Sequence, residues 1–349
     1  MALDKRSGAW YDVKKSLGVD FMAILVLGGA GYIGSHTVYE LIEAGREVIV
    51  ADNLQTGFRK AVHPKARFYE LDIRDRAALD ELFEKENVEG VIHFAASSQV
   101  GESMTDPLKY YDNNLCGTAC LLQAMVAHGV DKIVFSSTAA VYGEPERVPI
   151  LESDRTEPTN CYGETKLAME KMMSWTARAH GLRYVALRYF NACGAHHDGL
   201  IGEAHSPETH LIPLILQVPN GQRKSISVFG TDYDTRDGSC IRDYIHVSDL
   251  ARAHILALDY LTEGGESDVF NLGNGVGFSV REMIDVARSV TGHPIPAVEE
   301  ARRAGDPAVL IASGKKAAEV LGWKPVYTRV EDIVSDAWRW HSAHPRGFE

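Results

Sequence analysis

The 349-residue sequence has no apolar run that approaches the roughly eighteen residues of a membrane-spanning helix. Its five cysteines are an odd number without the regular spacing of a disulfide framework, so we expect a reducing, cytoplasmic location. Residues 1–21 carry scattered charges and no apolar signal-peptide core. We interpret them as an extension, native or introduced by cloning, ahead of a natural start at Met22.

The sequence also lacks an excess of positive charge. Its formal net charge is −12, which argues against general binding to nucleic acid or to an anionic membrane. With 45% hydrophobic and 24% charged residues, the composition is that of an ordinary globular protein, and the length is sufficient for two lobes. Any anionic ligand would therefore need a local cluster of basic groups.

Apolar runs alternate with amphipathic stretches through the first half of the chain. The runs rich in Val, Ile and Phe predict buried strands at 23–28, 47–52, 90–96, 132–137 and 183–190. The stretches between them predict helices at 33–45, 76–87, 113–129 and 162–181. Regular alternation of this kind predicts an α/β fold of the Rossmann type, with a doubly wound parallel sheet.

The pattern changes after residue 192. Loops rich in Gly, Asp, His and Pro follow, and then predicted helices at 247–261, 279–291 and 329–341 with a strand at 268–273. We therefore predict a first domain over 22–192, joined by later segments near 240–262. A smaller mixed α/β lobe over 193–349 would complete the chain.

A glycine-rich turn follows the first predicted strand and opens the first predicted helix. "GGAGYIGSH" places glycines at Gly28, Gly31 and Gly34, where the backbone can approach a pyrophosphate at the helix N-terminus. Asp52 ends the second strand eighteen residues after Gly34 and would accept hydrogen bonds from both ribose hydroxyls. Because a carboxylate there repels the extra phosphate of NADP, we expect NAD.

Two further strand ends point to the same cofactor. Asp72 follows another short strand and could hold the adenine amino group. Phe94, Ala95 and Ala96 end the strand at 90–96 and would line the cofactor.

Residues 161–166, "CYGETK", place Tyr162 and Lys166 about one helical turn apart on the same face. Free tyrosine has a pKa of about 10, so it is a poor base at neutral pH. We expect Lys166 and a positively charged nicotinamide to lower the pKa of Tyr162 and to favour the phenolate. Thr138, in "SSTAAVYG" at a strand end, would face the same ligand crevice.

The glycine turn, the strand-end hydroxyls and Tyr-x-x-x-Lys together are characteristic of the extended short-chain dehydrogenase/reductase superfamily. Further motifs, in order over residues 22–345, resemble the UDP-glucose 4-epimerase family; they include "RYFNACGAH", "NLGNGVGFSV" and "RRAGDPA". The resemblance implies tightly held NAD, a UDP-hexose substrate, a 4-keto intermediate that turns over, and a homodimer built on the helices near 113–128 and 162–181.

The resemblance also implies roles for individual residues. Thr138 would hydrogen-bond the sugar 4-oxygen, and Asn191, Arg242 and Arg303 would hold the diphosphate. Asp306 would bind the uridine ribose and Phe229 would pack near uracil, while Asn113 and Tyr189 would line the nicotinamide and sugar pocket. Further expected cofactor contacts are Tyr32, Ile33, Asn53 and Ile73, and further expected substrate contacts are His210 and Leu211.

Leu310 bears on substrate choice. Family members with tyrosine at this position tend to exclude N-acetylated sugars, and those with a small residue admit them. Leucine lies between the two, so an epimerase of UDP-N-acetylglucosamine, or one with dual specificity, is an open alternative. We expect no metal, because the adjacent His196 and His197 have no carboxylate or cysteine at metal spacing.

Two other functions can be weighed against epimerisation. Dehydratases and decarboxylases of nucleotide sugars need a carboxyl group just after the strand-end hydroxyls, where this chain has Ala139 and Ala140. A catalytically inactive NAD-binding sensor would have no need for Tyr162, Lys166 and Thr138 together.

Overall fold

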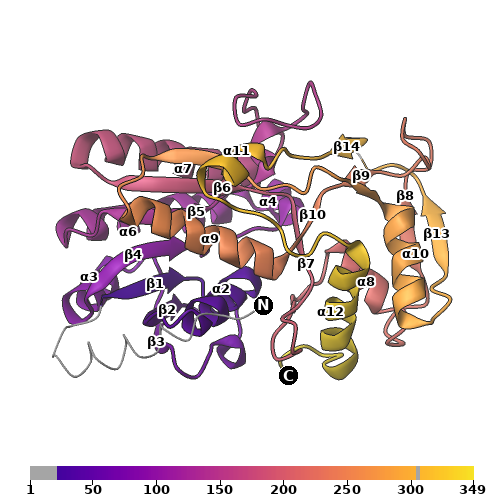
Figure 1. Ribbon diagram of the computed structural model, residues 1–349, viewed down its shortest axis with the longest axis horizontal. Coiled ribbons are helices and arrows are strands. Elements are labelled where there is room, and N and C mark those ends of the chain that lie inside the picture. The colour runs from indigo at the N-terminus through magenta and orange to yellow at the C-terminus, as the bar shows by residue number, and fades with distance from the viewer. Residues whose placement is uncertain (1–21, 304–306) are drawn as a thin grey trace.

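A seven-stranded parallel sheet forms the centre of the computed structural model, which describes residues 22–303 and 307–349 (Figure 1). The strand order is β11-β6-β5-β4-β1-β2-β3, so the chain reverses direction across the sheet between β1 and β4. The strands are β1 (Ala23–Leu27), β2 (Val48–Asp52), β3 (Arg67–Glu70), β4 (Val88–His93), β5 (Lys132–Ser136), β6 (Arg183–Arg188) and β11 (Asp268–Asn271). The predicted Rossmann-type sheet is confirmed.

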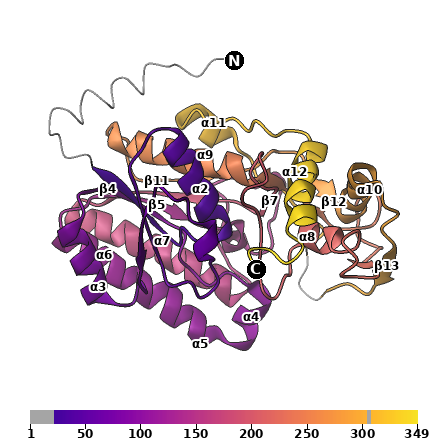
Figure 2. The ribbon, with the colours of Figure 1, turned by 90° about the horizontal axis from the view of Figure 1, so that it is seen from below.

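Helices cover both faces of the sheet (Figure 2). One face carries α2 (Tyr32–Glu43), α9 (Val247–Thr262) and α11 (Lys315–Val320). The opposite face carries α3 (Arg76–Lys85), α6 (Gly117–Ala127) and α7 (Cys161–His180). Because both faces are covered, β1 and β2 are buried throughout, which is why they appear in the sequence as continuous apolar runs.

Local signals fix the ends of α7, the helix that carries the Tyr-x-x-x-Lys pair. The Asn160 side chain accepts a hydrogen bond from the backbone N–H of Gly163 at the start of the helix. Gly181 ends the helix with φ of 74°, in the left-handed region that favours glycine.

The second half of the chain contributes to the first domain beyond the segment near 240–262. α9 packs on α2, and β11 adds the seventh strand by pairing in parallel with β6. Trp323, just after α11, is buried in the same core and donates its indole N–H to the carbonyl of Asp249 in α9. Residues far apart in sequence therefore complete this core.

The smaller lobe lies at one end of the molecule (Figures 1 and 2). Its apolar core is formed by side chains of three helices and of β8 (Ile226–Phe229), together with Cys193 and Tyr244 from the strands at the junction. The helices are α8 (Leu211–Leu216), α10 (Val280–Thr291) and α12 (Val330–Ala343), whereas β13 (Ala297–Glu300) pairs with β8 but is exposed along its length. A reciprocal capping box between Ser279 and Glu282 starts α10.

Short strands join the two parts of the molecule. β7 (Asn191–Cys193) pairs with β10 (Tyr244–His246), and β9 (Ile241–Arg242) lies between β12 (Phe278–Ser279) and β14 (Val309–Leu310). Within the described residues, no helix is both long and apolar enough to span a bilayer.

Candidate active site and cofactor site

The carboxyl ends of the parallel strands gather the predicted site residues at one edge of the sheet. Gly28 directly follows β1, Asp52 ends β2, Phe94 follows β4 and Thr138 lies two residues after β5. In an open α/β sheet, ligands bind outside these ends, at the point where the strand order reverses. That point lies between β1 and β4.

The glycine turn is shaped to let a ligand approach the start of α2. A Cβ atom added at Gly34 would lie 2.1 Å from the Gly28 carbonyl oxygen, and one added at Gly28 would lie 2.6 Å from the Ala95 nitrogen. Gly31 is the N-cap of α2 and brings no side chain to the first-turn N–H groups. These N–H groups are suited to the pyrophosphate of NAD.

Asp52 holds the same turn from the next strand. Its carboxylate accepts hydrogen bonds from the backbone N–H groups of Ala30 (2.9 Å) and Leu54 (2.8 Å). Burial raises the pKa of Asp52, and these two N–H groups oppose the rise. The carboxylate thus lies against the glycine turn, where the sequence predicts a contact with the adenosine ribose.

Asp72 and Asn53 lie beside Asp52 at the edge of the sheet. The Asn53 amide donates to Asp72 (3.0 Å), and Arg74 pairs with the same carboxylate (2.7 Å). The Arg74 guanidinium holds the pKa of Asp72 well below its usual range. An adenine amino group that binds Asp72 would therefore share its carboxylate with Asn53 and Arg74.

The other predicted cofactor residues differ in what they can offer. Phe94, Ala95 and Ala96 are half-buried beside the glycine turn. Ile73 is buried against α6, and Ile33, in the first turn of α2, packs against the core. The Tyr32 hydroxyl donates to the Gly194 carbonyl (2.7 Å), which leaves its backbone for any cofactor contact. The Tyr189 hydroxyl shares a short hydrogen bond with Ser136.

The structure brings Tyr162 and Thr138 together. Burial raises the pKa of Tyr162 to about 12, and a hydrogen bond from the Thr138 side chain acts in the opposite direction. Thr138 Oγ1 also accepts a hydrogen bond from the Ala140 N–H (3.1 Å), which fixes the hydroxyl at the start of a short 3₁₀ turn, η3 (Ala139–Tyr142). Its own proton remains available for the phenol or for a substrate oxygen.

Lys166 lies beside the Tyr162 ring, but its hydrogen bond goes to another group. Its ammonium lies 5.8 Å from the centre of the Tyr162 ring and donates to the Ser136 carbonyl (2.9 Å). Burial lowers the pKa of Lys166 to about 7, although Glu170 opposes this shift. Among the chain's own groups, burial therefore has the largest effect on the pKa of Tyr162. The expected fall depends on Lys166 together with a positively charged nicotinamide, and it stays a prediction.

A buried ion pair beneath Lys166 was missed by the sequence reasoning. Glu170 and Arg188 form a two-bonded pair, with nitrogen–oxygen distances of 2.6 and 3.0 Å, and both side chains are less than a tenth exposed. The Ser137 hydroxyl donates to the same glutamate. Glu170 lies one turn after Lys166, so helical spacing from Tyr162 could have indicated that it shares this face.

Asn114 is a second residue that the sequence reasoning missed. It lies in a π-helical segment, η2 (Tyr111–Cys116), and its side chain is buried. The amide accepts from the Ser97 N–H (2.8 Å) and donates to the Thr165 hydroxyl (3.0 Å). Asn114 therefore ties the loop after β4 to α7, whereas the predicted Asn113 donates its side-chain N–H to the Asn114 side chain (3.1 Å).

Several predicted substrate residues lie on the short strands at the junction of the two lobes. Asn191, in β7, donates to the Asp243 carbonyl (3.1 Å), and Leu310 in β14 is the register partner of Arg242 in β9. Leu310 also packs against the apolar cluster that contains Ala139 and Val141, directly after Thr138. These strands place Leu310 close to the catalytic turn.

The remaining predicted substrate residues belong to the smaller lobe. The Arg303 guanidinium lies 3.9 Å above the centre of the Phe229 ring, a cation–π arrangement that supports the ring as a stacking surface. Leu211 begins α8 and packs into the core of this lobe. Asp306 lies outside the described residues.

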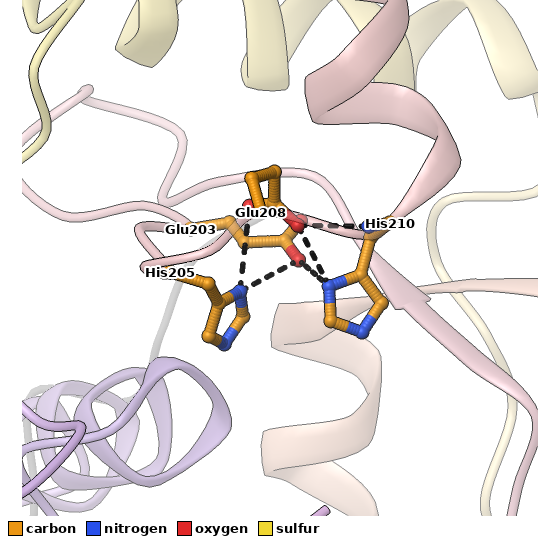
Figure 3. Close-up of side chains that lie close together, drawn as sticks. All are labelled: Glu203, His205, Glu208 and His210. Carbon is orange, nitrogen blue, oxygen red and sulfur yellow. Dashed lines mark hydrogen bonds and ion pairs between the residues drawn. The ribbon is translucent and has the colours of Figure 1, made fainter. Parts of the chain in front are cut away.

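His210 is not free to contact a phosphate through both ring nitrogens. Its Nδ1 lies 2.9 Å from a Glu203 oxygen and 3.0 Å from a Glu208 oxygen (Figure 3). Burial disfavours the charged imidazole, but the two glutamates outweigh it and raise the pKa of His210 to about 10. Only Nε2 remains for the predicted phosphate contact.

Comparison with known proteins decides the family. The model of the NAD dependent epimerase/dehydratase family matches residues 24–273. The UDP-glucose 4-epimerase of Halalkalibacterium halodurans is 61% identical over 94% of this chain and 98% of its own length. This chain belongs to the UDP-glucose 4-epimerases of that family.

Solved structures of this epimerase family agree with the fold. One UDP-glucose 4-epimerase structure has a TM-score of 0.93 at 57% identity and covers 94% of this chain and 99% of its own. The epimerase from Bifidobacterium longum, solved with NAD⁺ and UDP, has a TM-score of 0.89 at 40% identity and covers 94% and 100%. NAD is the cofactor of this family, and the glycine turn and Asp52 fit it.

Proposed function

We propose that this protein interconverts UDP-glucose and UDP-galactose by inverting carbon 4 of the hexose. Membership of the UDP-glucose 4-epimerases supports this activity. The observation that carries it is the meeting of the Tyr162 phenol and the Thr138 hydroxyl at the carboxyl end of β5, at the same edge of the sheet as the glycine turn that fits NAD. Bound NAD supplies an acceptor for the hydrogen of carbon 4 and a positive charge beside the phenol.

Thr138 and Tyr162 would move the proton of the sugar 4-hydroxyl. Thr138 is fixed through the Ala140 N–H and can pass the proton to the phenolate of Tyr162. Because burial holds the phenol neutral, the proton leaves only when positive charge is close. Lys166, with a pKa near 7, can respond to the charge of Tyr162 from the same buried pocket.

The diphosphate would anchor the substrate while the keto sugar turns over. Asn191, Arg242 and Arg303 bring amide and guanidinium donors from three separate segments of the chain. Arginine suits this task because its planar fork pairs with phosphate oxygens. Strong diphosphate contacts combined with weak hexose contacts would let either face of carbon 4 turn toward the nicotinamide, while the 4-oxygen stays within reach of Tyr162.

Turnover tests this proposal directly. The purified protein should convert UDP-galactose to UDP-glucose without added cofactor, because it retains NAD. If NAD remains bound and no product forms, the protein is an NAD-binding sensor instead of an epimerase.

We expect Leu310 to set the preference between plain and N-acetylated hexoses. Leu310→Tyr adds bulk beside the Ala139–Val141 cluster and should lower kcat/KM for UDP-N-acetylgalactosamine about tenfold relative to UDP-galactose, whereas Leu310→Ser should raise this ratio. Side-by-side assays with both substrates give the ratio. Equal losses on both substrates for Leu310→Tyr would indicate a folding defect and remove Leu310 as a specificity residue.

We also propose that the protein is a homodimer through α7, as the resemblance implies, and through the neighbouring α4 (Val100–Thr105) and α5 (Pro107–Tyr110) in place of the helix near 113–128. Met104, Leu108 and Trp175 expose 60%, 77% and 67% of their surface, which is unusual for side chains of this size. Light scattering should give twice the chain mass of 38.4 kDa, and Leu108→Glu with Trp175→Glu should give the monomer. A monomeric wild-type protein would refute the proposal.

A further inference from the structure

Four metal-ligating side chains converge in the segment between β7 and α8, away from the catalytic tyrosine. Glu203, His205, Glu208 and His210 each direct one ligand atom toward a common point, and these atoms all lie within 4.8 Å of one another (Figure 3). The sequence reasoning considered only His196 and His197, and it was wrong to find no carboxylate beside them, because His196 Nδ1 lies 2.6 Å from an Asp198 oxygen. It missed the group of four, although the repeated spacing Glu-x-His and Glu-x-His was visible.

The distances in the cluster resemble the edges of a coordination tetrahedron. His205 Nδ1 lies 3.3 Å from Glu203 and 3.5 Å from Glu208, and His210 Nδ1 lies 2.9 and 3.0 Å from the same two carboxylates. Zinc bonds of about 2.0–2.1 Å to nitrogen and oxygen place tetrahedral ligands about 3.3 Å apart. The four nitrogen–oxygen distances lie on both sides of this value.

His205 gives an independent indication that something is missing from this point. Its Nδ1 atom is buried and makes no hydrogen bond, even though two carboxylates are close. The separations of 3.3 and 3.5 Å are longer than an ordinary N–H···O bond, which is 2.7–3.2 Å. A buried nitrogen that has two carboxylates near it but no hydrogen bond is what a cation bound between these groups would satisfy.

The surroundings hold the two carboxylates out of water. The Glu203 and Glu208 side chains are only 3% and 8% exposed. Glu208 is oriented by the backbone N–H groups of Thr209 (2.7 Å) and His210 (2.8 Å), and the Trp340 indole donates to the Glu203 carbonyl (3.1 Å). Two buried negative charges need two positive charges nearby, which either two protonated imidazoles or one divalent cation would supply.

We propose that Glu203, His205, Glu208 and His210 bind one divalent first-row transition metal, with Zn²⁺ as the best match. Two imidazoles and two carboxylates form a neutral set around M²⁺, and this nitrogen and oxygen mixture suits zinc better than magnesium or calcium. The metal has a structural role. It links the segment before α8 to the region of Tyr32 in α2, whose ring makes an edge contact with His205.

The metal also has a consequence that rests on the proposed substrate role of His210. With Nδ1 bound to the metal, the remaining ring proton must lie on Nε2. His210 would then present a fixed donor to the diphosphate of the substrate.

Metal analysis of the holoenzyme tests the proposal without reference to turnover. The tag-free wild-type protein, dialysed against metal-free buffer, should retain about one Zn²⁺ per chain by mass spectrometry. After chelation, added Zn²⁺ should raise its Tm. His205→Gln should weaken Zn²⁺ binding at least ~100-fold. Removing a residue that hydrogen-bonds a metal ligand already weakens metal binding by up to about 100-fold, and removing the ligand itself should cost no less.

His197→Gln is the matched control, since His197 belongs to the other candidate group, His196, His197 and Asp198. It should bind Zn²⁺ as the wild type does. Glu208→Gln preserves side-chain shape and should repeat the His205→Gln result if that variant folds poorly. Absence of metal together with no Zn²⁺-dependent Tm shift in the wild type would mean that two protons balance the carboxylates instead. Equal binding by wild type and both ligand variants would equally overturn the site.

Discussion

Replacement of Tyr162 by phenylalanine should lower kcat for UDP-galactose by about 10²- to 10⁴-fold, the usual contribution of a positioned acid or base. The ring that packs in the buried pocket is preserved, so the protein should still fold and retain NAD. Only the hydroxyl that meets Thr138 is lost. The measurement is kcat together with the NAD content of the denatured protein.

Tyr260→Phe is the control for this experiment. Tyr260 lies in the last turn of α9, and its hydroxyl accepts a hydrogen bond from the Glu266 N–H. This bond involves none of the predicted site residues, so loss of the Tyr260 hydroxyl should leave kcat unchanged. Wild-type turnover in Tyr162→Phe would remove Tyr162 as the base. A parallel loss of NAD and turnover would instead indicate a binding defect.

Arg188→Met should destabilise the protein by about 3–5 kcal/mol, because it leaves the buried carboxylate of Glu170 without its partner. Arg188 also donates to the Tyr142 hydroxyl (2.9 Å), so one substitution opens two contacts in the layer beneath the site. The uncompensated charge of Glu170 would then interact with Lys166, one turn away on α7. Thermal or urea unfolding measures the loss.

Two comparisons separate the buried pair from ordinary ion pairs. Arg188→Met combined with Glu170→Met removes both charges and should recover most of the lost stability. Arg281→Met breaks an exposed pair with Glu299 and should cost no more than about 1 kcal/mol. If Arg188→Met and Arg281→Met lower the free energy of unfolding by similar amounts, the buried ion pair is no more important for stability than an exposed one.

The sequence predicted the central sheet because buried parallel strands are continuous apolar runs with helices between them. It could not predict that β11 pairs with β6, since about eighty residues, with several short strands and the helices α8 and α9, lie between them in the sequence. Such pairing depends on the packing of α9 against α2, which brings residues 247–271 back to the first domain. Sequence periodicity describes each element but not its distant neighbour.

The candidate site was predicted where a motif has a fixed local geometry. The glycine turn, Asp52 and the Tyr162–Lys166 helix face all depend on contacts within one strand–turn–helix unit. The spacing to Lys166 did not reveal how strongly burial raises the pKa of Tyr162, because burial depends on the whole fold. Asn114 was missed because nothing in its sequence distinguishes a π-helical turn from an α-helical one.

The four-residue cluster shows a different limit. Glu203, His205, Glu208 and His210 lie in an irregular segment, so their spacing alone does not indicate that the side chains converge. Convergence depends on where the segment is held by α8 and by Trp340 of α12. A pattern of ligands in a loop becomes a site only once the surrounding helices fix the loop.

The most direct measurement of the proposed chemistry follows deuterium placed on carbon 4 of UDP-galactose. Tyr162 and Thr138 handle only the oxygen-bound proton, so the label on carbon should leave and return within the protein. We expect UDP-glucose formed in ordinary water to retain nearly all of the deuterium at carbon 4. Washout of the label into solvent at the rate of turnover would contradict inversion through a 4-keto sugar.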